Sequence, residues 1–231
     1  QELKVPQPYR WDLDHPHLYT VVTAIMRDGV LLDRVATPFG IRSFQFSPDE
    51  VSAGPGFSQR SGFVFVGNGK HRPNLDAIFR LKSRIWPVLR ERVPNSCLKI
   101  FGAYLPTSIQ NLNAPEEGFE VQGWAPELQP IFESARLQLA PLHFGAGVKG
   151  KILSALQFGL PTLSTAIGWE GIYEGTASVD FLAKDPGDFV KKAALLYASE
   201  GAWGRSLRLQ LKASAHHFEP SLGPLLDAME N

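Results

Sequence analysis

The chain has 231 residues, no formal net charge at pH 7, and the apolar and charged content of an ordinary globular protein. The balanced charge gives no general affinity for nucleic acid or an acidic membrane, and the single cysteine, Cys97, excludes an internal disulfide and a cysteine metal site. We find no apolar segment of membrane-spanning length and no signal peptide, which predicts a cytoplasmic protein. The chain begins at Gln1 in the middle of a pattern, so we expect a fragment of a longer protein.

Residues 1–46 are predicted to form an antiparallel β segment. Its short β-rich runs cover residues 19–26, 30–36 and 40–46. Asp28-Gly29 between the first two runs favours a tight hairpin turn. Such a meander cannot bury its apolar face alone, so it needs the rest of the chain, another copy or missing strands. We expect Trp11 and Tyr19 to anchor that packing, and the open strand edges offer a route to a homodimer.

Residues 47–61 are rich in proline, glycine and serine and are predicted to form a linker. Beyond it, in residues 62–231, apolar strands alternate with helical patterns. The predicted strands are 63–67, 98–102, 120–123, 137–142 and 162–165; the predicted helices are 75–92, 107–112, 127–134, 149–158, 185–199 and 203–217. This alternation predicts an α/β domain with a Rossmann-like parallel sheet that carries helices on both faces.

Ligands of such sheets bind at the carboxyl ends of the strands. Gly67-Asn68, Gly123-Trp124 and residues 144–149 all fall at that edge, so the spacing alone predicts a crevice there. Two interpretations of Trp124 remain open at this point, because a tryptophan after a strand either contacts a ligand or packs into the core.

A glycine-rich turn, residues 143–151, links the apolar strand that ends at Leu142 to a helix. Its glycines allow close approach of the backbone, and the unpaired N–H groups of a helix start favour an anion. Lys149 and Lys151 add positive charge where the helix dipole disfavours it, a conflict that a negative ligand would resolve. A tight turn with solvated lysines explains the same residues, and the turn alone does not decide between the two.

From about residue 62 onward, the chain resembles the C-terminal, donor-binding half of family 4 glycosyltransferases of the GT-B fold. The matching segments are Phe63-Val64-Phe65-Val66-Gly67-Asn68, Pro73-Asn74-Leu75-Asp76-Ala77, Leu98-Lys99-Ile100-Phe101-Gly102-Ala103, Val121-Gln122-Gly123-Trp124-Ala125-Pro126, and the glycine-rich turn with Gly159-Leu160-Pro161. They follow the family's order and spacing. The resemblance implies a nucleotide-sugar donor (a UDP, GDP or ADP sugar), no tightly bound cofactor, and hexosyl transfer with retention of configuration.

The resemblance also implies roles for individual residues. It assigns the donor diphosphate to Gly67, Asn68, Gly145, Ala146, Gly147, Val148 and Lys149. It assigns the region of the nucleobase and ribose to Gly123, Trp124, Ala125, Pro126 and Ser154. His143 stands just before the turn, where it contacts a sugar or phosphate or has a structural role.

The chain departs from the resembled family at several of these positions. Ser154 stands where the family often has a glutamate, Ala146 where an earlier acidic residue is common, and Asn68 and Pro73 approximately where an arginine and a lysine are common. These departures predict weakened donor binding. The acceptor-binding domain of a GT-B enzyme is absent from this sequence, so we expect weak activity or none, and the catalytic residues stay unknown. No histidine pair has metal-ligand spacing, which predicts no bound metal.

A second resemblance covers the β segment and points to family 2 glycoside hydrolases. Trp11, Pro16, Leu18-Tyr19-Thr20, Asp28-Gly29, Asp33-Arg34-Val35 and Phe39-Gly40-Ile41-Arg42-Ser43-Phe44 are similar to the last strands of that family's immunoglobulin-like sandwich. The two resemblances together predict a chimera, a fusion or a fragment. They leave an alternative function: an accessory β-sandwich piece of a β-galactosidase-like hydrolase, or a structural assembly module without catalysis.

Overall fold

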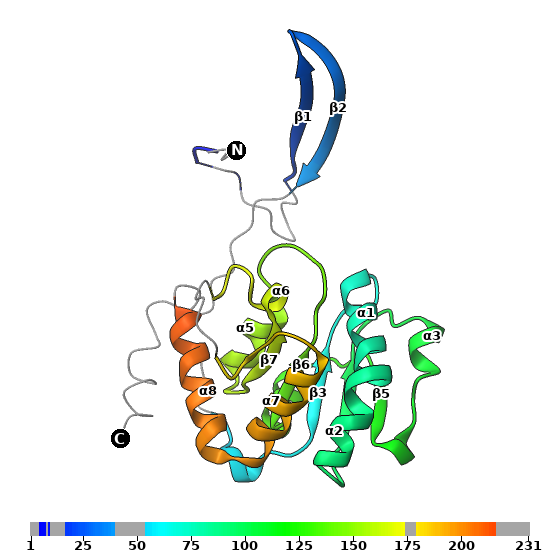
Figure 1. Ribbon diagram of the computed structural model, residues 1–231, viewed down its shortest axis with the longest axis vertical. Helices are drawn as coiled ribbons and strands as arrows, with labels where there is room; N and C mark the ends of the chain where they lie inside the picture. The colour runs from blue at the N-terminus through cyan, green and yellow to red at the C-terminus, as the bar shows by residue number, and fades with distance from the viewer. Residues whose placement is uncertain (1–4, 8, 10–16, 40–53, 174–178, 216–231) are drawn as a thin grey trace. The chain divides into compact units, whose positions relative to one another are not determined.

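The structure, a computed structural model, describes residues 5–7, 9, 17–39, 54–173 and 179–215 (Figure 1). The chain divides into two compact units, Gln1–Gln45 and Phe46–Asn231. The first unit contains a β-hairpin, and the second is a layered α/β domain.

The hairpin pairs β1 (Tyr19–Arg27) with β2 (Val30–Phe39) in antiparallel register. Asp28 and Gly29 at its tip have φ angles of 51° and 78°, which confirms the tight Asp-Gly turn. Most of its apolar side chains are exposed, including Val22, which is 46% exposed. The predicted third strand, residues 40–46, and Trp11 lie outside the described residues.

A six-stranded parallel sheet forms the centre of the second unit, in the order β5-β4-β3-β6-β7-β8. Its strands are β3 (Phe63–Val66), β4 (Leu98–Phe101), β5 (Phe119–Gly123), β6 (Leu137–Ala140), β7 (Thr162–Thr165) and β8 (Leu182–Ala183). The predicted Rossmann-like sheet is therefore confirmed. The short edge strand β8 was not predicted, because two residues carry no pattern.

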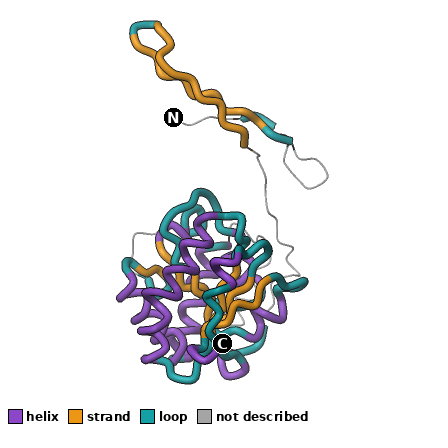
Figure 2. Tube along the Cα trace, turned by 90° about the vertical axis from the view of Figure 1, so that its right-hand side faces the viewer, coloured by secondary structure: helices purple, strands orange, loops and turns teal. Residues whose placement is uncertain are grey.

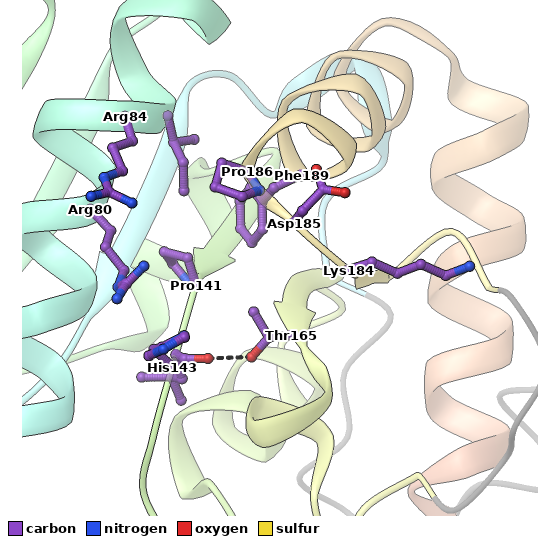
Figure 3. Close-up of a pocket in the computed structure, with 11 residues that line it drawn as sticks. Arg80, Arg84, Pro141, His143, Thr165, Lys184, Asp185, Pro186 and Phe189 are labelled. Carbon is purple, nitrogen blue, oxygen red and sulfur yellow. Dashed lines mark hydrogen bonds between the residues drawn. The ribbon is translucent and has the colours of Figure 1, made fainter.

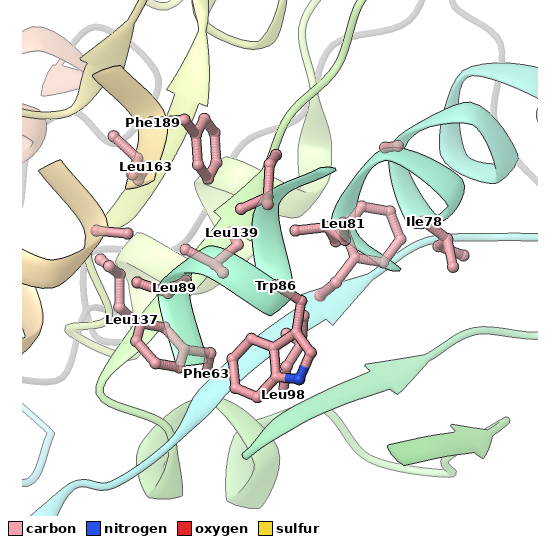
Figure 4. Close-up of a cluster of buried hydrophobic side chains, with 14 of the residues drawn as sticks. Phe63, Ile78, Leu81, Trp86, Leu89, Leu98, Leu137, Leu139, Leu163 and Phe189 are labelled. Carbon is pink, nitrogen blue, oxygen red and sulfur yellow. The ribbon is translucent and has the colours of Figure 1, made fainter. Parts of the chain in front are cut away.

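Helices cover both faces of this sheet (Figure 2). They are α1 (Arg72–Arg80), α2 (Trp86–Arg92), α3 (Thr107–Gln110), α4 (Gln129–Ser134), α5 (Gly150–Gln157), α6 (Ala166–Trp169), α7 (Pro186–Ala198) and α8 (Glu200–Ala213). The alternation of side chains along β3 divides the core between the faces. Phe63 and Phe65 pack with α1, α2 and α7, in a cluster centred on Trp86 (Figure 4), whereas Val64 packs with residues of α4 and α5.

The single helix expected over residues 75–92 contains a π-helical segment, η3 (Leu81–Ile85), between α1 and α2. Within it the Trp86 N–H bonds the Leu81 carbonyl, five residues earlier. Pro87, the next residue, lacks the N–H that would continue the α-helical pattern. The wider turn is thus a local response to proline.

The end of the expected linker is anchored to the α/β unit. Residues 54–61 contain a short 3-10 helix, η2 (Phe57–Gln59), and the fully buried Arg60. Arg60 donates hydrogen bonds to the carbonyls of Pro55, Phe132, Ala135 and Phe158. A linker that reaches residue 61, as the sequence suggested, is incompatible with this buried arginine. Residues 47–53 lie outside the described part of the chain.

Candidate functional site

A cavity of about 510 Å³ lies at the carboxyl edge of the sheet, where β3 and β6 end. The loop after β3, the start of α1, the glycine-rich turn and α5 surround it. Its lining comprises Val66, Gly67, Asn68, His71, Pro73, Asn74, Leu128, Leu142, Gly145, Ala146, Val148, Lys149, Gly150, Lys151 and Ser154. The crevice predicted at the carboxyl edge of the sheet is therefore present as this cavity.

The glycine-rich turn has a backbone that only glycine adopts readily. Gly145 and Gly147 have φ angles of 127° and 73°, in the left-handed region. Lys149 is the N-cap of α5 and no side chain caps the helix start. A Cβ atom at Gly150 would meet nothing within 4 Å. The Ile152 N–H bonds the Lys149 carbonyl at 2.8 Å, whereas no side chain caps the N–H groups of Gly150 and Lys151, and such an uncapped helix start suits an anion.

The two lysines of the turn have different partners. The Lys149 Nζ bonds the Gly147 carbonyl and lies 3.3 Å from the Glu170 carboxylate. The Lys151 Nζ donates to the Asn74 Oδ1 and lies 4.7 Å from the centre of the Phe65 ring. Burial, followed by repulsion from Lys149, lowers the pKa of Lys151 to about 7. Of these two lysines, only Lys149 is neutralised by a carboxylate within the described chain.

Asn74 joins the first loop to the glycine-rich turn. Its Nδ2 donates to the Asn68 carbonyl at 2.9 Å, while its Oδ1 accepts from Lys151. The Asn68 side chain accepts a hydrogen bond from the Lys70 N–H at 2.8 Å, a contact within the loop that stabilises its conformation. Gly67 allows this packing, since a Cβ there would lie 2.8 Å from the Asn74 Cγ. The first loop therefore contributes shape and an amide, not the arginine and lysine of the resembled family.

Gly123 and Trp124 line a different cavity, of about 440 Å³, beyond the ends of β4 and β5. Trp124 is 69% exposed, which excludes the core-packing interpretation of this residue. An exposed aromatic ring beside a cavity suits stacking against a planar ligand. Ala125 and Pro126 line neither this cavity nor the one at the glycine-rich turn.

His143 lines a third cavity, of about 200 Å³, with Arg80, Arg84 and Thr165 (Figure 3). The Thr165 hydroxyl donates to the Leu142 carbonyl there, and the Arg80 Nε lies 2.7 Å from the Asp76 carboxylate. His143 is absent from the lining of the cavity at the glycine-rich turn, although it directly precedes that turn.

The structure thus brings most of the predicted diphosphate residues together in one cavity, along with Ser154. Gly147 shapes the turn without lining that cavity. The sequence singled out Lys151, with Lys149, as positive charge at the helix start, but neither Lys151 nor Asn74 was assigned a role in the site. A further signal for Lys151 was its position three residues before Ser154, which places the two on one face of α5. Asn74 carried no comparable signal.

No aspartate or glutamate lines this cavity within the described residues. Among the same residues there is no cluster of three histidine, cysteine, aspartate or glutamate side chains that could hold a metal ion. No described helix is long and apolar enough to cross a membrane. The chemistry that the cavity offers is electrostatic: oriented backbone N–H groups and lysine side chains.

Two family models match the chain. The model of the glycosyl transferases group 1 matches residues 60–199, and the model of the glycosyl hydrolases family 2 matches residues 1–42. The N-terminal segment is also 54% identical over 44 residues to the β-galactosidase BoGH2A of Bacteroides ovatus, a match covering 19% of this chain and 5% of that protein. The expected fusion of two resemblances is confirmed.

Solved structures similar to the chain are GT-B glycosyltransferases. TarM is 13% identical to this chain, with a TM-score of 0.59. The match covers 78% of this chain and 37% of the TarM chain. The pneumococcal O-GlcNAc transferase GtfA, solved with UDP and GlcNAc, is 14% identical, with a TM-score of 0.57. The match covers 83% of this chain and 38% of the GtfA chain. OtsA is 11% identical, with a TM-score of 0.54, and the match covers 92% of this chain and 56% of the OtsA chain.

At these identities the likeness shows the fold alone, and the chain spans about 37–56% of the length of these three solved chains. The group 1 model, in contrast, matches more than half of this chain, across the sheet and the glycine-rich turn. The hydrolase likeness is confined to the N-terminal segment, so an accessory hydrolase piece is not the favoured account of the whole. The chain belongs to the glycosyl transferases of group 1 and carries a segment like family 2 glycosyl hydrolases at its N-terminus.

Proposed function

We propose that residues 62–231 are the donor-binding domain of a retaining hexosyltransferase, and that the cavity at the glycine-rich turn holds the diphosphate of a UDP, GDP or ADP sugar. The uncapped start of α5, which is open at Gly150 and flanked by Lys149 and Lys151, carries this proposal. Backbone N–H donors at a helix start bind an anion without loss of side-chain entropy, and the lysines supply positive charge.

The similar proteins support this assignment. GtfA was solved with UDP and GlcNAc. Another similar structure, at 11% identity and a TM-score of 0.54, is a trehalose-6-phosphate synthase studied for enzymatic glycosyl transfer with retention. Because Ser154 offers a neutral hydroxyl in place of the family's carboxylate, we expect weak donor binding and little or no turnover by this chain alone. Its cytoplasmic location stays a prediction.

The cavity suits stabilisation of a leaving group better than proton transfer. Two carboxylates flank the scissile bond in most glycoside hydrolases, whereas no described carboxylate lines this cavity. Departure of a nucleoside diphosphate instead places negative charge on phosphate oxygens, which oriented N–H groups and a lysine stabilise directly. This contrast favours transfer from an activated donor over hydrolysis.

An NMR titration of the isotopically labelled chain with UDP, GDP and ADP tests the location of the site. We expect one nucleotide to shift the backbone amide signals of Gly67, Gly145 and Gly150 in a saturable manner. The amides of α7 beside the His143 cavity should not move. Shifts centred on that third cavity would overturn the assignment.

We further propose that the nucleobase stacks on Trp124. Replacement of Trp124 by alanine should weaken nucleotide binding by about 1–3 kcal/mol, the usual contribution of base–aromatic stacking, or about 5- to 150-fold in Kd. Trp124→Phe keeps an aromatic face and should retain most of the affinity. Calorimetric titration of both variants measures this, and an unchanged affinity of Trp124→Ala would exclude stacking.

The N-terminal hairpin is proposed as a homodimer contact. Its two described strands expose the apolar side chains of Val22, Leu32 and Val35, and a hairpin of two strands is marginally stable alone. If this segment joins two copies, sedimentation will show a mass that rises with concentration in the unmodified chain. Val22→Lys should then remain a monomer at the same concentrations, because a lysine on the strand opposes pairing. A Val22→Lys mass that still rises contradicts the contact.

A further inference from the structure

Lys151 is the lysine of the cavity whose charge no described carboxylate balances. The ion pairs among the described residues include Lys149 with Glu170 at 3.3 Å but none that involves Lys151. The Lys151 Nζ instead rests against an amide oxygen of Asn74 and the face of Phe65. A neutral amide and a ring compensate the charge of this half-buried ammonium only in part, so Lys151 can accept a stronger anionic partner.

The residues packed around Lys151 hold it at the cavity, and the described cavity lining contains no acid. Gln138, buried on β6, donates to the Lys151 carbonyl at 3.2 Å and so fixes the first turn of α5. Phe65 on β3 and Asn74 on α1 hold the ammonium group inside the cavity. The other charged or titratable side chains in the lining are Lys149 and His71. Each of them is a base, so none competes with an anion for Lys151.

We propose that donor binding is coupled to protonation of Lys151, whose ammonium exchanges the Asn74 amide oxygen for an oxygen of the diphosphate. This inference rests on the proposed donor-binding function. The bond that is lost is a hydrogen bond to a neutral amide, and the bond that forms is charge-assisted. The proton comes from solvent and is released again when the diphosphate leaves. Lys151 would thereby supply the charge that Asn68 and Pro73 do not provide.

The direction of the coupling follows from the lowered pKa of Lys151, about 7 in the free cavity. Above that pH the free lysine is mostly neutral, whereas a bound diphosphate favours its charged form and raises its pKa. Binding therefore takes up a proton, and affinity falls as the pH rises. With the bound lysine charged throughout this range, a free pKa of about 7 corresponds to an uptake of more than about half a proton at pH 8 and to a loss of affinity of about 3- to 10-fold between pH 7.5 and 8.5.

Calorimetry in two buffers of different ionisation enthalpy measures the proton uptake directly. The probe is whichever of UDP, GDP and ADP binds the full chain most tightly. A nucleoside diphosphate is already ionised at these pH values, because the second pKa of a phosphate is about 6. Lys151→Met should bind at least tenfold more weakly at pH 7 and take up no proton. The matched variant His71→Gln should keep the uptake. Lys149→Met should keep a smaller uptake, because it removes the repulsion that helps to lower the pKa of Lys151.

Lys151→Arg keeps the result decisive if the methionine variant fails to fold. Arginine stays charged throughout the range, so this variant should bind without proton uptake and without the fall between pH 7.5 and 8.5. Equal affinity and equal proton uptake in the unmodified chain, Lys151→Arg and Lys151→Met would overturn the coupling while leaving the donor site intact. If no nucleotide binds the unmodified chain at any pH from 6.5 to 8.5, the donor site itself fails, and the coupling fails with it.

Discussion

Replacement of Gly150 by aspartate should abolish nucleotide binding while leaving the domain at least as stable as before. Gly150 is the first residue of α5, has no positive φ, and has open space where a Cβ would lie. An acidic residue in the first helical turn stabilises a helix by about 0.3–1 kcal/mol. The same carboxylate would occupy the position proposed for the diphosphate, and like-charge juxtaposition costs several kcal/mol, which is about 100-fold or more in Kd.

Calorimetric titration and thermal unfolding of Gly150→Asp, side by side with Gly150→Asn, separate these effects. Asparagine has nearly the same size without the charge, so it should lose much less affinity than aspartate does. Stability and binding are expected to move in opposite directions in the aspartate variant. Equal nucleotide affinity in Gly150→Asp and the unmodified chain would show that no anion binds at the start of α5.

Replacement of Arg60 by methionine should produce the largest loss of stability. Arg60 is 0% exposed and its guanidinium bonds the carbonyls of Pro55, Phe132, Ala135 and Phe158, which come from three separate loops or helix ends. Burial lowers the pKa of Arg60 to about 10, so the group is still charged at pH 7. Methionine would leave these carbonyls without their donor, and we expect a loss of about 3–5 kcal/mol in the free energy of unfolding.

Urea unfolding followed by circular dichroism measures this change. Arg84→Met, on the exposed side of η3, provides a matched control that should stay within about 0.5 kcal/mol of the unmodified chain. Arg60→Lys should also be destabilised, because an ammonium group cannot reproduce the planar fork of donors. A loss below about 1 kcal/mol in Arg60→Met would mean that water replaces the arginine at these carbonyls.

The sheet and the place of the cavity at its carboxyl edge were predictable from local pattern. Short apolar runs that alternate with helical periods, such as residues 137–142 followed by 149–158, specify a parallel sheet, and the carboxyl edge of such a sheet follows from the direction of the strands. Glycines at 145 and 147 identified the turn because they adopt positive φ angles. These features depend on neighbours in the sequence.

Contacts between distant residues were not predictable in this way. Asn74 and Lys151 are 77 residues apart, and Arg60 reaches Phe158 across 98 residues. Composition marked residues 47–61 as a linker, yet one buried arginine ties the end of that segment to the domain. His143 illustrates the same limit: its position before the turn gave no indication that its side chain lines a separate cavity.

Calorimetric titration of the unmodified chain with UDP, GDP and ADP, each compared with its nucleoside, tests the central claim most directly. We expect saturable binding of one diphosphate at a single site and no binding of the corresponding nucleoside, because the diphosphate supplies the charge that the turn recognises. If none of the three binds, and circular dichroism shows a folded domain, the chain retains the glycosyltransferase fold without a working donor site.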